Sequence, residues 1–239
     1  EFRRVLFRSI RGARAAVYGS EAVAGVINII TRKVSQSEVS ITGGTNSYQN
    51  AQGNFSLVKE NFSVNVNAGF EKTDGYDVTE KKDFDPSHKD ADNDGYENKN
   101  IGIHASLKTD IGNFTLISQH NRGSAQYDNA WGSDEGEFEN YVNQVSWQKQ
   151  SDQISHELNL SNTQDKNQQT GSVEGDNYQT DRSEAKYQLQ YNANDELTWS
   201  GGVNWYEESV DKTHVGGNAL NKTERDNFAI YAGGYYSGE

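Results

Sequence analysis

The chain of 239 residues has no cysteine, no methionine and a single proline, Pro86. Without cysteine it can hold neither a disulfide framework nor a zinc ion with cysteine ligands. It also lacks any apolar run that approaches the ~20 residues of a membrane-spanning helix. Hydrophobic residues make up only 33% of the chain and the net charge is −13, so positive charge is scarce as well. Such an acidic chain is a poor partner for nucleic acid, and its surface attracts cations instead.

What the sequence has in abundance is strict alternation of apolar and polar residues. In one segment the apolar positions are Phe62, Val64, Val66, Ala68 and Phe70, and the residues between them are Asn or small. The pattern recurs over residues 101–107, 154–160, 185–191, 197–205 and 228–232. A period of two residues predicts β-strands, and we expect about ten of them, starting near residue 37. A β-barrel with a polar lumen needs apolar residues only at every second strand position, which reconciles the strands with the polar composition.

The connections between these strands alternate in length. Short turns are expected near residues 59–61, 110–112, 151–152 and 194–195, and long polar loops near 72–98, 121–138, 161–181 and 207–224. Short turns at one end and long loops at the other are typical of outer-membrane barrels, whereas a soluble β-sandwich has no reason to alternate this way. The apolar face should then contact lipid and the polar face should line the lumen. Aromatic residues near strand ends are expected at the membrane interfaces: Tyr48, Phe70, Trp199, Trp205, Tyr206, Tyr231 and Tyr235.

The expected fold class is therefore all-β, a transmembrane antiparallel β-barrel in the outer membrane of a Gram-negative bacterium. Barrels whose lumen is plugged have roughly 22 strands. Ten strands alone would leave two open edges in hydrocarbon, which the bilayer does not tolerate. We therefore expect the sequence to represent only part of a barrel.

Residues 10–33 read IRGARAAVYGSEAVAGVINIITRK, a glycine-rich stretch that leads into an apolar strand over residues 26–31. The order Arg11-Gly12, Tyr18-Gly19-Ser20 and then Gly25 to Ile30 resembles the end of the plug domain of TonB-dependent outer-membrane receptors. The resemblance implies that residues 10–34 are the end of a plug and residues 35–239 the first part of the barrel. Residues 1–9 match neither pattern, and we expect them to be a non-native segment.

The loop after Phe70 contains Asp90, Asp92 and Asp94, followed directly by Gly95. Carboxylates at every second position before a glycine match the first half of a calcium-binding loop. The EF-hand itself is excluded, because its twelfth position would be Ile101 instead of glutamate. A calcium loop of another type and a merely solvated acidic loop remain as alternatives.

A second acidic stretch follows in the next long loop. Asp128, Asp134, Glu135, Glu137 and Glu139 lie there, and no lysine or arginine occurs between Gly123 and Gln148. Two neighbouring acidic loops repel each other unless a cation lies between them. Asp77, just after the preceding strand, adds a further carboxylate.

Within the receptor family this combination is similar to the members that transport cobalamin, or vitamin B12. The similarity rests on the plug-end residues and on Gly44-Thr45-Asn46-Ser47-Tyr48-Gln49-Asn50, Asp74-Gly75-Tyr76-Asp77-Val78, Asp92-Asn93-Asp94-Gly95 and Tyr127-Asp128. It implies calcium as a cofactor that orders the extracellular loops, with ligands at Asp77, Asp92, Asp94, Tyr127 and Asp128. Asp90 falls where the family often has glutamine, and the last ligand is expected at Glu139, with Asp134 close behind. Asn129 falls at a position that contacts the substrate.

The resemblance thus implies a transporter that binds cobalamin and imports it with energy supplied by TonB, through a part of the protein outside this sequence. A siderophore or other nutrient receptor is the alternative within the family, although acidic loops suit an anionic ferric siderophore poorly. A calcium-stabilised adhesin is an alternative of another class. We do not expect an enzyme, because the five histidines are scattered and no nucleophile–base pair is apparent.

Overall fold

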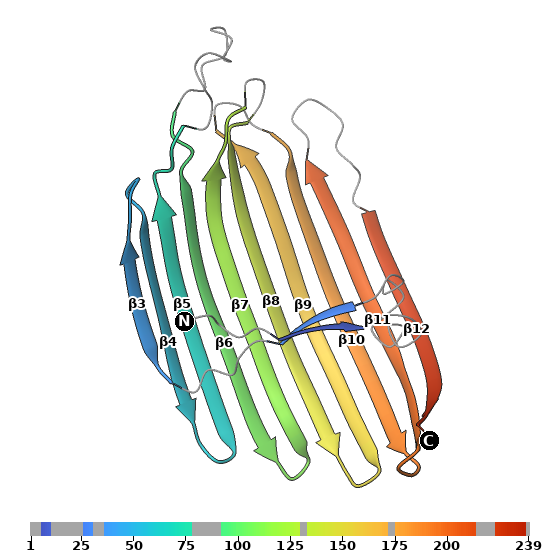
Figure 1. Cartoon of the computed structure of the whole chain (residues 1–239). Helices are drawn as coiled ribbons and strands as arrows, with labels where there is room; N and C mark the ends of the chain where they lie inside the picture. The colour runs from blue at the N-terminus through green and yellow to red at the C-terminus, as the bar shows by residue number, and fades with distance from the viewer. Residues whose placement is uncertain are drawn as a thin grey trace.

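The computed structural model describes residues 6–10, 26–30, 36–77, 92–129, 133–171, 175–213 and 223–237. These residues form one antiparallel sheet of ten strands and a separate pair of strands. No helix long and apolar enough to span a bilayer occurs in these ranges. The prediction of an all-β fold with about ten strands after residue 37 is confirmed (Figure 1).

The ten strands follow one another in the sheet in chain order, each paired with its sequence neighbours. They are β3 (Glu38–Gly43), β4 (Gln49–Val58), β5 (Phe62–Thr73), β6 (Tyr96–Thr109), β7 (Gly112–Gln126), β8 (Glu135–Gln150), β9 (Ile154–Thr170), β10 (Asn177–Asn192), β11 (Leu197–Thr213) and β12 (Thr223–Tyr236). The four short turns all lie at one end of the sheet, as expected (Figure 1). β3 and β12 are the two edges, so the sheet is an open segment of a barrel wall.

The strands reach further toward the long-loop end than their apolar residues predict. The loops expected over 121–138, 161–181 and 207–224 are wrong in their bounds, because β7 runs to Gln126, β8 begins at Glu135 and β10 begins at Asn177. Polar residues extend the ladder there, as in the pairing of Gln179 with Lys166. Backbone hydrogen bonds need no apolar side chains, so strands continue beyond the part that contacts lipid.

The register sorts the side chains by face. Apolar residues pair across strands on one face, as Val66 with Ile103 and Leu160 with Val145 do. These side chains remain exposed: Ile101 by 51%, Val145 by 46% and Leu160 by 47%. An exposed apolar face of this size is the surface that a barrel presents to hydrocarbon.

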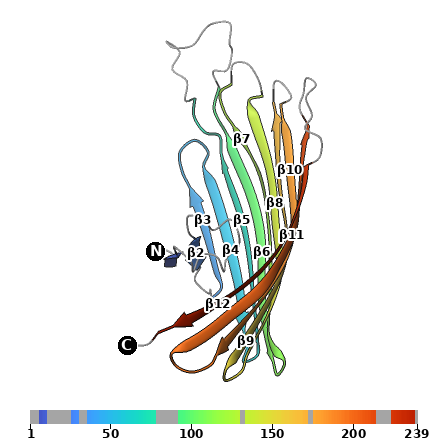
Figure 2. The same ribbon diagram turned by 90° about the vertical axis from the view of Figure 1, so that its right-hand side faces the viewer.

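The opposite face is polar and more crowded. Its side chains hydrogen-bond across the strands, as Ser63 does with Ser106 at 2.6 Å and as the Asn65 amide does to Asn54 Oδ1 at 2.6 Å. The sheet is curved, which crowds the side chains on its concave side (Figure 2). The two-stranded sheet of β1 (Leu6–Ile10) and β2 (Val26–Ile30) lies on that concave side in Figure 2.

β2 confirms the strand expected over residues 26–31 for its first five residues, Val26–Ile30, and it pairs antiparallel with β1. β1 reaches across residues 6–10 and so crosses the expected boundary between a non-native segment 1–9 and the plug. The assignment of residues 1–9, 10–34 and 35–239 to separate units stays a prediction.

Tyr206 is the most buried hydrophobic residue of the described chain, with 5% of its surface exposed. It lies on the polar face, opposite Glu184, and not at the membrane interface as its aromatic character suggested. The Arg182 guanidinium stacks 4.0 Å from its ring centroid, and the Arg225 guanidinium lies 5.2 Å away. Glu208 forms ion pairs with both arginines, and the N···O distance is 3.3 Å to Arg182 and 3.4 Å to Arg225. Tyr231 also lies on this face, so parity along the strand, not residue type, decides which aromatics reach lipid.

We expect Tyr206→Ala to lower the free energy of unfolding of the complete barrel protein by about 3 kcal/mol, because it removes a large buried ring and its cation–π contacts. Urea unfolding followed by tryptophan fluorescence measures this. Tyr206→Phe keeps the ring between the arginines and should change stability by less than about 1 kcal/mol. An equal loss in both variants would contradict stacking as the source of stability.

Candidate functional site

The long-loop ends of the hairpins are held together by backbone contacts between neighbouring loops. In the first loop, residues 74–77 and 92–95 lie against each other, and Asp94 N donates to Tyr76 O at 3.4 Å. Gly75 has a φ of 67°, and a Cβ there would lie 1.8 Å from the carbonyl oxygen of Asp94. Only glycine permits this crossing, because the conformation and the space both exclude a side chain. The crossing brings Asp77 and Asp94 to one end of the hairpin.

Gln126 joins the first loop to the second. Its backbone N–H donates to Gly95 O at 2.8 Å, and its side-chain Oε1 accepts from Gly95 N at 3.0 Å. The glycine that ends the acidic triplet is therefore fixed to the residue just before Tyr127. Asp94 and Asp128 each lie within two residues of this double hydrogen bond.

The second loop is closed by contacts with Ser133, which is 4% exposed. Tyr127 N donates to Asp134 O at 2.9 Å, and the Tyr127 hydroxyl lies 3.2 Å from Ser133 Oγ. The Asn129 amide donates to Ser133 O at 2.8 Å. Tyr127 and Asn129, both expected at the site, thus lie within one compact turn.

The third loop packs against the same turn. Gly171 has a φ of 104°, and a Cβ added to it would lie 1.5 Å from Asp134 Oδ1. Nearby, Lys212 Nζ pairs with Asp176 at 2.9 Å, and this hydrogen bond raises the pKa of Lys212. Asp134 therefore lies where the second and third loops meet.

The expected calcium ligands are placed as follows. Asp77, Asp92, Asp94, Tyr127 and Asp128 all lie in the described loop ends, while Asp90 lies outside the described residues. Asp94 Oδ2 and Asp128 Oδ1 are shielded from solvent. Within the described ranges, no three Asp, Glu or His side chains lie close enough together to hold a metal ion. The structure thus brings the segments together without closing a ligand shell.

Glu139 differs from the others because it lies within β8. It pairs with Arg122 in the register, and its Oε1 lies 2.9 Å from His120 Nε2. At ~3.3 Å per strand residue, Glu139 is about 16 Å along β8 from Asp134. Asp134 is the carboxylate that the structure places at the loop junction.

Gly75, Gln126, Ser133 and Gly171 hold the junction together, and the sequence analysis expected a role at this junction for none of the four. Asp74-Gly75 is a dipeptide typical of turns, and this was the one local signal available. The other three act through contacts between hairpins, which no local spacing reveals.

Comparison with models of protein families finds no match for this chain. Among curated proteins, it is 30% identical over 237 residues to the vitamin B12 transporter BtuB of Photobacterium profundum, over 95% of this chain and 37% of that protein. It is 31% identical over 237 residues to the vitamin B12 transporter BtuB of Vibrio cholerae serotype O1, over 93% of this chain and 37% of that protein. The chain therefore spans little more than a third of the length of these relatives.

Two solved structures have a similar fold. A mutant of the ferric enterobactin receptor PfeA from Pseudomonas aeruginosa matches 95% of this chain and 41% of its own, with a TM-score of 0.66 and 18% identity. The siderophore receptor PiuA from Acinetobacter baumannii matches 91% of this chain and 41% of its own, with a TM-score of 0.59 and 13% identity. At this identity they show the fold alone, and they confirm that the sheet is part of a β-barrel wall. The curated relatives, together with this fold, confirm the resemblance found from the sequence and the location in the outer membrane of a Gram-negative bacterium.

Proposed function

Because the chain resembles TonB-dependent outer-membrane receptors along nearly all of its length, we propose that it is a segment of a transporter that takes up cobalamin. The observation that supports this most is the similarity of 30–31% to two vitamin B12 transporters over almost the whole chain. In this proposal residues 10–34 end the plug, and residues 35–239 form the first part of the barrel wall. The complete receptor would use TonB for energy, through a part outside this sequence.

Calcium is the proposed cofactor of the loop ends. Three observations support it: the alternating carboxylates Asp90, Asp92 and Asp94; the hydrogen bonds of Gln126 that hold Asp94 near Asp128; and the shielding of an oxygen of each of these two residues. Removing carboxylate oxygens from water costs free energy, which a hard divalent cation with oxygen ligands offsets. Asp77 and Tyr127 lie in the same loop ends and complete the proposed set, with Asp134 or Glu139 as the last ligand.

Cobalamin would bind above the plug, against the loops that calcium draws together. Asn129 is the proposed contact with cobalamin in this segment, because its turn lies at the same loop end as Asp128. The side-chain amide of Asn129 already donates a hydrogen bond to Ser133 O and so holds the turn in place. Substrate binding at Asn129 and the order of the loop would therefore be coupled.

The test is a titration of the complete receptor in outer membranes with cyanocobalamin, once with millimolar calcium and once with a chelator. We expect tight binding in calcium and binding weaker by about tenfold or more in chelator, the size of a typical coupling between two ligands. Binding of equal strength in both conditions would remove calcium from the proposal and leave cobalamin. No cobalamin binding in either condition, with binding of a ferric siderophore instead, would establish the alternative substrate.

The absence of enzymatic activity also stays a proposal. It agrees with the relatives, whose names describe transporters and receptors. Retention of unmodified cyanocobalamin after binding, checked by its absorption spectrum, tests it.

A further inference from the structure

Three side-chain rings lie next to one another on the lipid-facing side of the sheet, near the short-turn end. The ring centroids of Trp147 and His156 are 6.0 Å apart, and those of His156 and Tyr187 are 6.2 Å apart. Trp147 and Tyr187 are both paired with Leu158, a residue of the apolar face, and His156 is the next position of that face along β9. The rings therefore extend across β8, β9 and β10 on the side that contacts lipid.

The polar atoms of Trp147 and Tyr187 already have partners within the sheet. Trp147 Nε1 donates to Ile111 O at 3.0 Å, and its indole lies so close over Gly112 that a Cβ there would be 2.5 Å from Nε1. The Tyr187 hydroxyl lies 2.8 Å from His156 Nδ1. A hydroxyl that donates to Nδ1 leaves the imidazole proton on Nε2, and Nε2 has no hydrogen-bond partner among the described residues. His156 Nε2 is thus the polar group of this row that is available to a ligand.

Lys149 lies beside this row of rings. It is paired with His156 in the register, so the Cβ atoms of the two residues are about 5 Å apart. Along β8 it directly follows Val145 and Trp147 on the lipid-facing side, and no polar position of that side separates it from them. Lys149 is exposed, and it forms no ion pair or side-chain hydrogen bond with another described residue. An ammonium group and an imidazole nitrogen therefore lie side by side at the border of the apolar surface.

The lipid-facing positions around Lys149 carry no carboxylate in the part of the chain that the structure describes. Asp152, in the turn that follows β8, is exposed and forms no ion pair with Lys149. The residues that the register places in line with Trp147 or Lys149 on this side are all uncharged apart from His156: Phe62, Leu107, Phe114, Leu158, Tyr187, Val203, Ile230, Leu189, Gly201 and Ala232. The charge of Lys149 is therefore not neutralised on this side of the sheet.

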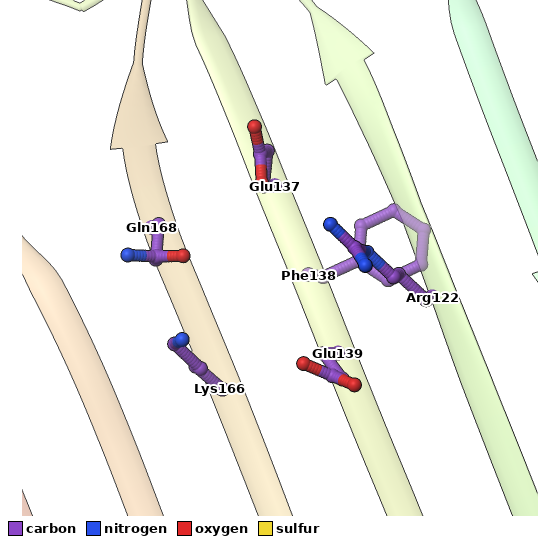
Figure 3. A pocket seen from close by; sticks show the side chains of 6 residues that line it. All are labelled: Arg122, Glu137, Phe138, Glu139, Lys166 and Gln168. Carbon is purple, nitrogen blue, oxygen red and sulfur yellow. The ribbon is translucent and has the colours of Figure 1, made fainter.

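The same side of the sheet has a different charge distribution near the long loops. There Arg122 and Lys166 line a hollow of about 270 Å³ together with the carboxylates Glu137 and Glu139 (Figure 3). Arg122 and Glu139 are also paired in the register. Positive and negative groups offset each other at that end, whereas the short-turn end has an uncompensated base.

We propose that Lys149 and His156 bind the phosphate of a phospholipid in the periplasmic leaflet of the outer membrane. Short turns are periplasmic in such barrels, so both residues lie at the depth of that leaflet's head groups. The lysine supplies a compact positive charge and the imidazole a directed N–H donor, while the acyl chains lie along Val145 and Leu158. The adjoining apolar surface supports a lipid over a free anion. The inference rests on the outer-membrane location and is independent of which substrate the receptor transports.

The experiment measures binding of phosphatidylglycerol to the complete receptor in detergent, by native mass spectrometry at increasing lipid concentration. We expect the double variant Lys149→Gln, His156→Gln to bind the lipid about tenfold more weakly, because it loses one positive charge near the head group and one hydrogen bond to a charged oxygen. The matched control is the double variant His104→Gln, Lys108→Gln. It changes the same two residue types at the same end of the sheet, on β6, but on the polar face.

Two further measurements identify what is bound. Diacylglycerol, which has the acyl chains without the phosphate, should bind wild type and the Lys149→Gln, His156→Gln variant alike, and millimolar inorganic phosphate should not displace phosphatidylglycerol. Equal binding of phosphatidylglycerol by wild type and this variant, an equal loss in the control, or an equal loss of diacylglycerol binding would overturn the proposal. Displacement by inorganic phosphate would overturn the lipid and leave a site for free anions. Heat-dependent migration in gels establishes that the variants are folded.

Discussion

Replacing both Asp92 and Asp94 by asparagine in the complete receptor should abolish the difference between cobalamin binding in calcium and in chelator. The substitutions keep shape and hydrogen-bonding capacity but remove two negative charges from the proposed calcium loop. Affinity in calcium should fall by about tenfold or more, to the level of the wild type in chelator. Equilibrium binding of cyanocobalamin to outer membranes, with and without calcium, measures both quantities.

The matched control removes two carboxylates from the opposite end of the sheet. Asp152 and Asp195 lie in short turns, beyond β8 and β10, and Asp152→Asn with Asp195→Asn changes the net charge equally. This variant should keep the full calcium response. A calcium response that survives in Asp92→Asn, Asp94→Asn, or that is lost in the control, would show that the acidic triplet is not the site.

The strands of the barrel wall were predictable because apolar and polar residues alternate along each strand with its lipid-facing and polar sides. Phe62, Val64 and Val66 face lipid, and the residues between them face the crowded polar side. The sequence itself therefore shows which residues lie on which face of the strand. The ends of the strands were not predictable in this way. Gln179 and Lys166 pair in a region where both faces are polar, and there the ladder is maintained by the backbone.

The candidate site likewise has one part that could be predicted from the sequence and one part that could not. The carboxylates could be found because ligand types and spacing are local properties of Asp92, Asp94 and Asp128. The junction that holds them depends on one hairpin meeting the next, as in the double hydrogen bond between Gln126 and Gly95. Contacts of this kind depend on strand register and loop length together, and they cannot be predicted from the residue pattern of a single sequence.

Gly75→Ala should weaken calcium binding because it separates the two halves of the first loop. Its φ of 67° disfavours any residue with a Cβ by about 1 kcal/mol. The larger effect is steric, since the new Cβ would lie 1.8 Å from the Asp94 carbonyl oxygen, which belongs to the backbone and cannot rotate away. Residues 74–77 must then move off residues 92–95, and Asp77 moves away from Asp94. The calcium concentration that gives half of the full effect on cyanocobalamin binding by the complete receptor should rise about tenfold.

Two variants separate these causes. Gly53→Ala adds the same methyl group at a strand position with no atom within 4 Å, and it should leave the calcium dependence unchanged. Gly75→Asn introduces a residue that tolerates positive φ but still carries the Cβ, so it relieves the conformational penalty and not the clash. If the crossing of the two segments positions the ligands, Gly75→Asn is as defective as Gly75→Ala. Recovery of wild-type calcium dependence in Gly75→Asn would instead assign the whole effect to backbone conformation, and the close approach of Gly75 to Asp94 would then have no part in binding.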